Sequence, residues 1–378
     1  MGYLLHIFIV GMAIFSMFFG GGNLTYPLWI GSETASVSLS SFGFFLSGVL
    51  LPLYGIVISI YFKGNYESYL NSCGKAFGAV LVFALLSFWI PFGSGPRCNH
   101  LAFGAFSTQF AWDIPFWVYS LIYSIVVYVL TYRENRVIEI LGKVITPLLI
   151  LSLAFLIYVG FAAPELNSVA TINPSNSHSF LASFFAGYHT MDFIAAIFFS
   201  STVISLIKEK QKEKFNMSLV SNACLFALVL LSLIYIGLIN LGHASAESLI
   251  NVPRDRLLAV IGQQLVGAQF QFIIFVVITL SVLSTSIALS LVFSDYLRKT
   301  LFRNKLSHPI CLLLSVGISF FMSIIGFENL SVIISHATNI LYPVLLLVTT
   351  LAFFKSLYGS QRSNAAPSPM QSNAPVVE

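Results

Sequence analysis

The sequence predicts an all-α polytopic membrane protein with ten transmembrane helices, and three observations support this. Of its 378 residues, 57% are hydrophobic and only 8% are charged, against about 25% in a typical soluble domain. A soluble domain this apolar could not cover its surface, because charged side chains belong in water. Ten apolar runs are long enough to cross a bilayer as helices. The cations lie in alternate loops, as in proteins that cross a membrane repeatedly.

The apolar runs follow one another through short polar connections, and each has roughly 18 or more residues. They cover residues 3–30, 42–62, 76–108, 115–132, 137–162, 180–207, 218–241, 264–297, 309–326 and 330–354. We therefore predict a single transmembrane domain over residues 1–357. Residues 358–378 are rich in Ser, Asn, Ala and Pro, a composition that predicts a disordered tail.

Positive charge indicates the orientation of the chain. Fifteen of the 18 Lys and Arg residues follow the even-numbered runs. The opposite loops contain only Arg254 and Arg256, and Arg97 lies inside the third run. Because cytoplasmic loops are enriched in Lys and Arg, both termini are predicted to be cytoplasmic. The net charge of +4 is then a topology signal, and no nucleic-acid partner is expected.

Two matching interruptions divide the chain into halves, residues 3–162 and 180–354. The first run is interrupted by Gly20, Gly21, Gly22 and Asn23, and the sixth contains Gly187, Tyr188, His189 and Thr190 at a comparable depth. Five spans in each half would give an inverted 5+5 repeat with helices 1 and 6 broken. Interrupted segments at matching positions indicate a transporter binding site. The alternative is that these glycines only allow close helix packing.

Chemistry at the first interruption suits a zwitterion. The unpaired N–H groups that open the outer half-helix, from Gly20 to Asn23, lie at a positive dipole end and suit a carboxylate. The carbonyl groups of Ser16 and Phe19, which end the inner half-helix, suit a cation. An amino acid carries both charges on neighbouring atoms.

Hydroxyl groups in the eighth run form a candidate cation site. Ser281, Ser284 and Thr285 share one helix face by their spacing. Uncharged oxygen ligands suit a hard monovalent ion such as Na⁺, by extension from other hard cations. The alternative is that these hydroxyls bond their own helix or a neighbouring one.

Arg97 and Asp192 lie near the middle of the third and sixth runs. A single charge at such a depth costs about 2.5–3.5 kcal/mol to insert, so we predict that the two residues pair. A purely structural role for the pair is the alternative. His189 could titrate near neutral pH and carry a proton.

Three motifs in order resemble the bacterial branched-chain amino acid:cation symporters (the LIVCS or BrnQ-type carriers). They are the segment 18–27 around Gly20, the element Gly95-Pro96-Arg97, and the segment 187–192 that ends at Asp192. The resemblance implies a LeuT-like fold and a location in the bacterial inner membrane. It also implies uptake of Leu, Ile or Val with Na⁺, or alternatively with H⁺.

The resemblance also implies residue roles. Ser284 and Thr285 would bind Na⁺ through their side chains, and Ser16, Phe19 and Ser281 through carbonyl groups. Substrate would lie between the interruptions in the first and sixth helices. Relatives of this family usually have about twelve spans, whereas ten are counted here, which leaves the oligomeric state open.

Two other classes of function compete with this interpretation. One is a transporter of the same fold for a different solute, such as another amino acid or a nucleobase. The other is a channel or a membrane-embedded enzyme. Enzymes in membranes usually cluster His, Asp or Glu, whereas the ionisable residues here are dispersed and no ATP-binding motif is present. We therefore expect a transporter that is not an enzyme and needs no cofactor besides its coupling ion.

Overall fold

The computed structural model describes residues 3–110, 112–162, 176–210, 217–254, 256–266 and 271–365, and every regular element among them is a helix. Helices of the first half are α1 (Tyr3–Phe18), α2 (Gly21–Glu33), α3 (Val37–Phe45), α4 (Leu51–Tyr61), α5 (Tyr66–Leu70), α6 (Lys75–Trp89), α7 (Gly95–Phe110), α8 (Phe116–Thr131), α9 (Glu134–Ile140) and α10 (Thr146–Ala162). Those of the second half are α11 (Asn176–Tyr188), α12 (Asp192–Lys210), α13 (Met217–Ala244), α14 (Leu257–Val266), α15 (Gln271–Tyr296), α16 (His308–Ser323) and α17 (Phe327–Ala365).

Seven helical segments of the described chain are long and apolar enough to cross a membrane, and the bent pair α1 and α2 makes an eighth. α8 and α16 are apolar but shorter, and they lie where the two remaining runs were predicted. The all-α membrane class is therefore confirmed. The ten-helix 5+5 arrangement stays a prediction, because α8 and α16 fall short of spanning length.

In the described part of the chain, four wide helical turns of the π type lie within or at the end of long spans. They cover Leu46–Leu50 between α3 and α4, Ile90–Ser94 between α6 and α7, Leu141–Ile145 between α9 and α10, and Leu297–Leu301 after α15. Such turns occur frequently at functional sites. One of them ends at Ser94, a residue that lines the central cavity described below.

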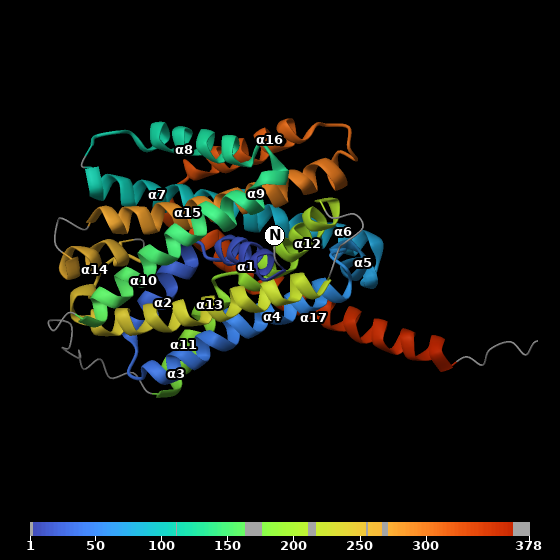
Figure 1. Ribbon diagram of the computed structural model, residues 1–378, viewed down its shortest axis with the longest axis horizontal. Coiled ribbons are helices and arrows are strands. Elements are labelled where there is room, and N and C mark those ends of the chain that lie inside the picture. The colour runs from blue at the N-terminus through green and yellow to red at the C-terminus, as the bar shows by residue number, and fades with distance from the viewer. Residues whose placement is uncertain are drawn as a thin grey trace, which may run out of the picture.

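The second half of α1, from Val10 to Phe18, and most of α2 are buried in the interior of the bundle (Figure 1). α13 packs against both α1 and α2, and α15 packs against α7. Glycines allow α2 and α13 to approach closely: a methyl group on Gly31 would overlap the carbonyl of Ile239, and one on Gly242 would overlap that of Leu28. This close packing fixes α2 against α13.

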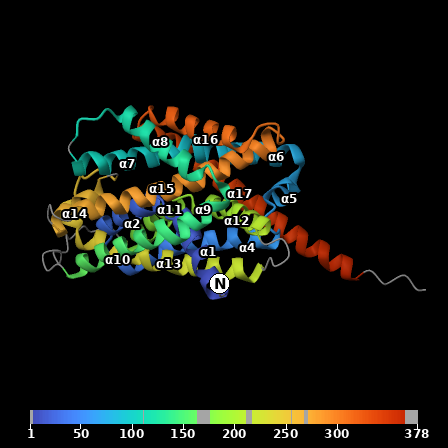
Figure 2. The ribbon, with the colours of Figure 1, turned by 45° about the horizontal axis from the view of Figure 1, so that its top comes forward.

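Outer helices carry the surface expected to meet lipid. α8 and α16 lie together along one side of the bundle, in both views (Figures 1 and 2). Leu121, Ile125 and Val129 of α8 are all exposed, as suits side chains that face hydrocarbon. By contrast, the span that contains α12 is almost wholly enclosed by other helices.

α17 continues to Ala365 and extends away from the bundle (Figure 1). It therefore includes residues 358–365 of the segment predicted to be a tail. Residues 366–378 lie outside the described part of the chain, so the tail remains a prediction there.

Candidate functional site

The first span is broken at Phe19 and Gly20, and α1 and α2 meet at an angle of 68°. Gly21, Gly22 and Asn23, predicted as part of the break, form the first turn of α2 instead. The Asn23 side chain reaches back, and its Oδ1 accepts a hydrogen bond from the Gly20 amide at 3.3 Å. The amides of Gly21 and Gly22 lie where an α-helix offers no intrahelical acceptor.

The sixth span is interrupted between Tyr188 and Asp192. Met191 has a φ of +64°, a left-handed conformation that a non-glycine residue seldom adopts. Thr190 donates from its hydroxyl to the Gly187 carbonyl at 2.7 Å. Both interruptions thus occur where matching breaks were predicted, and Asp192 opens the second half-helix.

A cavity lies between the two breaks. Of the predicted substrate residues, Gly20, Gly21, Gly22, Asn23 and Thr190 line it. Gly187 instead packs against the turn that contains Ser47, where a methyl group would overlap the Ser47 hydroxyl. The other residues that line the cavity are Met17, Phe18, Trp89, Ser94, Arg97, Cys98, Leu101, Met191, Asp192, Ala195, Phe199, Thr285 and Leu289.

This lining combines apolar walls with a few polar groups, as small-molecule sites usually do. The large side chains Phe18, Trp89 and Phe199 come from three different spans. Sequence reasoning missed them because aromatic residues are abundant throughout the chain. Tyr188 and His189, predicted as substrate residues, are not part of this lining. The Tyr188 ring packs on the ring of Tyr342, and the His189 ring on that of Tyr26.

The predicted cation ligands come together between α1 and α15. The Ser281 hydroxyl donates to the Phe19 carbonyl at 2.9 Å, and the Ser284 hydroxyl donates to the Ser16 carbonyl at 2.9 Å. Thr285 Oγ1 is buried without a hydrogen-bond partner in the described part of the chain. A methyl group on Gly20 would lie 2.8 Å from that oxygen.

Asp192 belongs to a buried polar cluster. Its Oδ2 accepts hydrogen bonds from Asn23 Nδ2 at 2.6 Å and from the Tyr235 hydroxyl at 3.1 Å. Only 2% of Asp192 is exposed, so these donors compensate for the lost hydration of the carboxylate. The cluster connects α2, α12 and α13. Sequence reasoning missed Tyr235, because a tyrosine within an apolar run carries no signal of its own.

Arg97 and Asp192 both line the cavity, and their pairing stays a prediction. The Arg97 guanidinium carbon lies 6.0 Å from the centroid of the Tyr26 ring. Arg254, from the connection between α13 and α14, lies 3.6 Å from the centroid of Trp29. Both arginines thus make cation–π contacts with aromatic side chains of α2.

Comparison with known proteins identifies the chain's relatives. Residues 4–372 match the family model described as branched-chain amino acid transport protein. A putative branched-chain amino acid carrier protein of Staphylococcus aureus (strain USA300) is 28% identical over 94% of this chain and 83% of its own length. The branched-chain amino acid permease BrnQ of Bacillus subtilis (strain 168) is 26% identical, over 93% of this chain and 82% of its own length.

Proposed function

Because this chain belongs to the family of branched-chain amino acid transport proteins, we propose that it is a secondary symporter that takes up Leu, Ile or Val together with Na⁺. It works by alternating access, in a LeuT-like arrangement of ten transmembrane helices in two inverted halves. It resides in the bacterial inner membrane with both termini in the cytoplasm.

The observation that carries sodium coupling is the set of oxygens between α1 and α15. Two carbonyl groups, of Ser16 and Phe19, already accept hydrogen bonds from Ser284 and Ser281, and Thr285 adds a buried oxygen without a partner. A Na⁺ ion here would take lone pairs from all five residues. It would fasten the inner half of the first span to α15.

Substrate would bind in the adjoining cavity. The amides of Gly21 and Gly22 suit its carboxylate, since they lie at the positive end of the α2 dipole. Asp192 is the anionic group of the cavity lining, and it offers a counter-charge for the ammonium group. The apolar walls from Phe18, Trp89 and Phe199 would surround an aliphatic side chain.

Proton coupling is the second candidate, and Asp192 favours it. A carboxylate that is 2% exposed and lines the cavity could take up and release a proton as the site opens to either side. The Tyr235 hydroxyl would support either charge state, because a hydroxyl can donate or accept, and Asn23 Nδ2 would donate to a carboxyl oxygen in both states.

Uptake into proteoliposomes tests both candidates. Labelled leucine is offered under an imposed Na⁺ gradient and then under an imposed H⁺ gradient, and sodium coupling predicts accumulation only in the first. Linkage requires that Na⁺ and leucine raise each other's affinity by the same factor. Equal leucine affinity with and without Na⁺, at constant ionic strength, would contradict sodium coupling. Accumulation under the H⁺ gradient alone would support the role of Asp192.

A further inference from the structure

A second pocket, which shares no lining residue with the substrate cavity, lies where α8 and α15 end and α9 and α16 begin. It is lined by Tyr132, Arg133, Glu134, Arg136, Arg298 and His308. The loops that supply these residues are the cation-rich loops predicted to be cytoplasmic. Nothing in the transport mechanism above uses this pocket.

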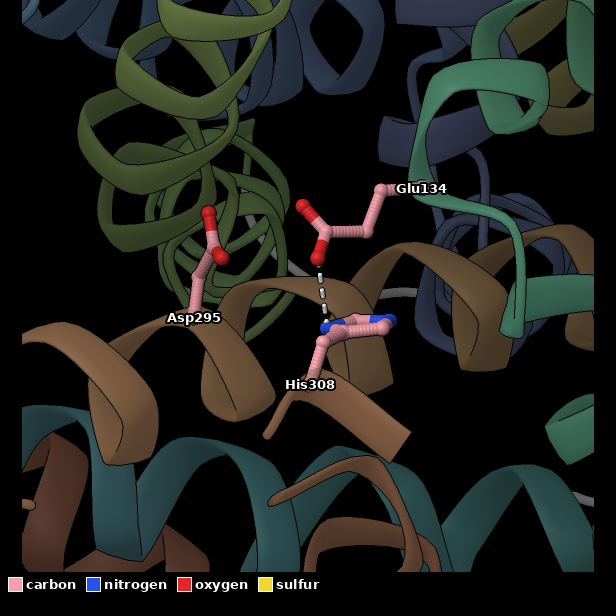
Figure 3. Close-up of side chains that lie close together, drawn as sticks. All are labelled: Glu134, Asp295 and His308. Atoms are coloured by element: carbon pink, nitrogen blue, oxygen red, sulfur yellow. Dashed lines mark ion pairs between the residues drawn. The ribbon is translucent and has the colours of Figure 1, made fainter. Parts of the chain in front are cut away.

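An ion-pair network forms its floor. Arg298 bonds both carboxylate oxygens of Glu134, at 2.8 and 3.4 Å, and also reaches Asp295 at 3.0 Å. His308 Nδ1 lies 2.8 Å from Glu134 Oε1 (Figure 3). Burial raises the pKa of the Glu134 carboxyl, but His308, Arg298 and Lys299 outweigh that effect and hold the pKa below its usual range.

Glu134, Asp295 and His308 lie close enough together to hold a metal ion. Arg298 argues against one, because its guanidinium already contacts both carboxylates. Lys299 adds a further positive charge, 2.9 Å from Asp295. The carboxylates are therefore neutralised by the protein itself, and the pocket as a whole is positive.

Positive charge and hydrogen-bond donors remain unused in this pocket. Arg133 and Arg136 are exposed and form no ion pair with an acidic group in the described part of the chain. His308 is 9% exposed, yet its Nε2 has no hydrogen-bond partner among the described residues, and neither has Arg298 Nε. Burying such groups unpaired is costly, so this site is built to receive an acceptor.

Exposed apolar side chains border the pocket on two helices. Val129 lies in the last turn of α8 and Tyr132 directly follows that helix, and Ile310 and Leu313 lie in the first turns of α16. α8 and α16 run side by side along the outside of the bundle (Figures 1 and 2). The pocket is thus continuous with a surface expected to meet acyl chains. Such an apolar border would contact a phospholipid, whereas free phosphate has no acyl chains to place there.

We propose that this pocket binds the phosphate headgroup of an anionic phospholipid, with the acyl chains lying along α8 and α16. Arg133 and Arg136 pair with the phosphate. His308, as an imidazolium with its Nδ1–H directed at Glu134, donates a hydrogen bond from Nε2 to the phosphate. Basic pockets between helices at the membrane boundary are suited to anionic headgroups. The bound lipid would connect the start of α9 to α16.

Native mass spectrometry of the full chain tests this proposal. The protein in neutral detergent is titrated with phosphatidylglycerol or phosphatidylcholine of the same acyl chains. We expect phosphatidylglycerol to bind more tightly, and the double variant Arg133→Gln/Arg136→Gln to lose about tenfold of that affinity. Because both arginines are exposed, we expect the variant to fold. Its elution on size exclusion, compared with that of the unmodified protein, checks this.

The matched control is Arg303→Gln/Lys305→Gln, which removes two exposed cations from the loop between α15 and α16 but none from the pocket lining. It should bind phosphatidylglycerol as the unmodified protein does. Equal losses in the two double variants would overturn the proposal in favour of diffuse surface charge. Equal binding of the two lipids, or displacement of phosphatidylglycerol by millimolar inorganic phosphate, would overturn it as well.

Discussion

The hydroxyl of Ser284 lies 2.9 Å from the carbonyl oxygen of Ser16, although 268 positions separate the two residues in the chain. The hydrogen bond joins the last turns of α1 to the middle of α15. It also occupies a carbonyl lone pair that a cation would need. If Na⁺ binds here as proposed, it would exchange this bond for coordination, and the ion's effect on transport should depend on the neighbouring hydroxyl groups.

Thr285→Ala tests the ion site, because Thr285 Oγ1 is the buried oxygen of this cluster without a described partner. We expect about a tenfold rise in the Na⁺ concentration needed for half-maximal leucine uptake, equivalent to about 1.4 kcal/mol. Ser286→Ala is the control, since the Ser286 hydroxyl pairs with Tyr123 at 2.9 Å, away from α1. Equal losses in both variants would mean that the hydroxyl cluster only joins helices.

Gly20→Ala should block the proposed Na⁺ site sterically, because the added methyl group would occupy space beside Thr285. Its new methyl group would lie 2.8 Å from Thr285 Oγ1, where it excludes an ion. We expect Na⁺-dependent uptake to fall at least tenfold while the protein remains folded. The control Gly22→Ala meets its neighbours at 3.7 Å, an ordinary van der Waals distance, and should keep its Na⁺ dependence. Normal Na⁺ dependence in Gly20→Ala would contradict the assignment.

Asp192 and Tyr235 should act as a unit. Their hydrogen bond is buried and shared with Asn23, and residues in one network show interaction energies of about 0.5–3 kcal/mol. A double-mutant cycle with Asp192→Asn and Tyr235→Phe, read as leucine affinity, should therefore be non-additive. Simple additivity would show that the two side chains contribute to binding separately.

The predicted pairing of Arg97 with Asp192 needs its own cycle. If the two charges compensate each other, Arg97→Gln combined with Asp192→Asn should cost less transport activity than the sum of the single changes. Thermal stability of the purified variants should follow the same pattern. Additive losses in both measurements would contradict the pairing of Arg97 with Asp192. The hydrogen bonds from Asn23 and Tyr235 would then be the interactions that compensate the Asp192 charge.

Glu134→Gln should destabilise the protein in a pH-dependent way. Because its pKa is held below the usual value of 4.5, the charged carboxylate stabilises the folded state above that pH. This contribution is lost as the pH falls through the lowered pKa. We expect a cost of about 2 kcal/mol at pH 7, seen as a lower melting temperature in detergent. The gap from the unmodified protein should narrow below pH 4.5; a constant gap would argue against a charge effect.

Sequence patterns predicted the parts of the site that depend on local chemistry. Glycines and Asn23 in an apolar run indicated a break, and hydroxyl spacing placed Ser281, Ser284 and Thr285 on one face. Packing decided the rest. The break falls at Phe19 because Asn23 reaches back to the Gly20 amide, and Tyr235 joins the cluster only because α13 packs on α2. Such long-range contacts leave no trace in a single run of residues.

The cation–π contact between Arg254 and Trp29 gives the molecule an optical reporter. Trp29 is one of four tryptophans in the chain, and its indole has a guanidinium carbon 3.6 Å from the ring centroid. Trp112 and Trp117 are largely exposed, and Trp89 is buried. If α2 moves away from Arg254, the emission of Trp29 should change. A variant that keeps only Trp29 would allow movement of α2 relative to Arg254 to be followed by intrinsic fluorescence.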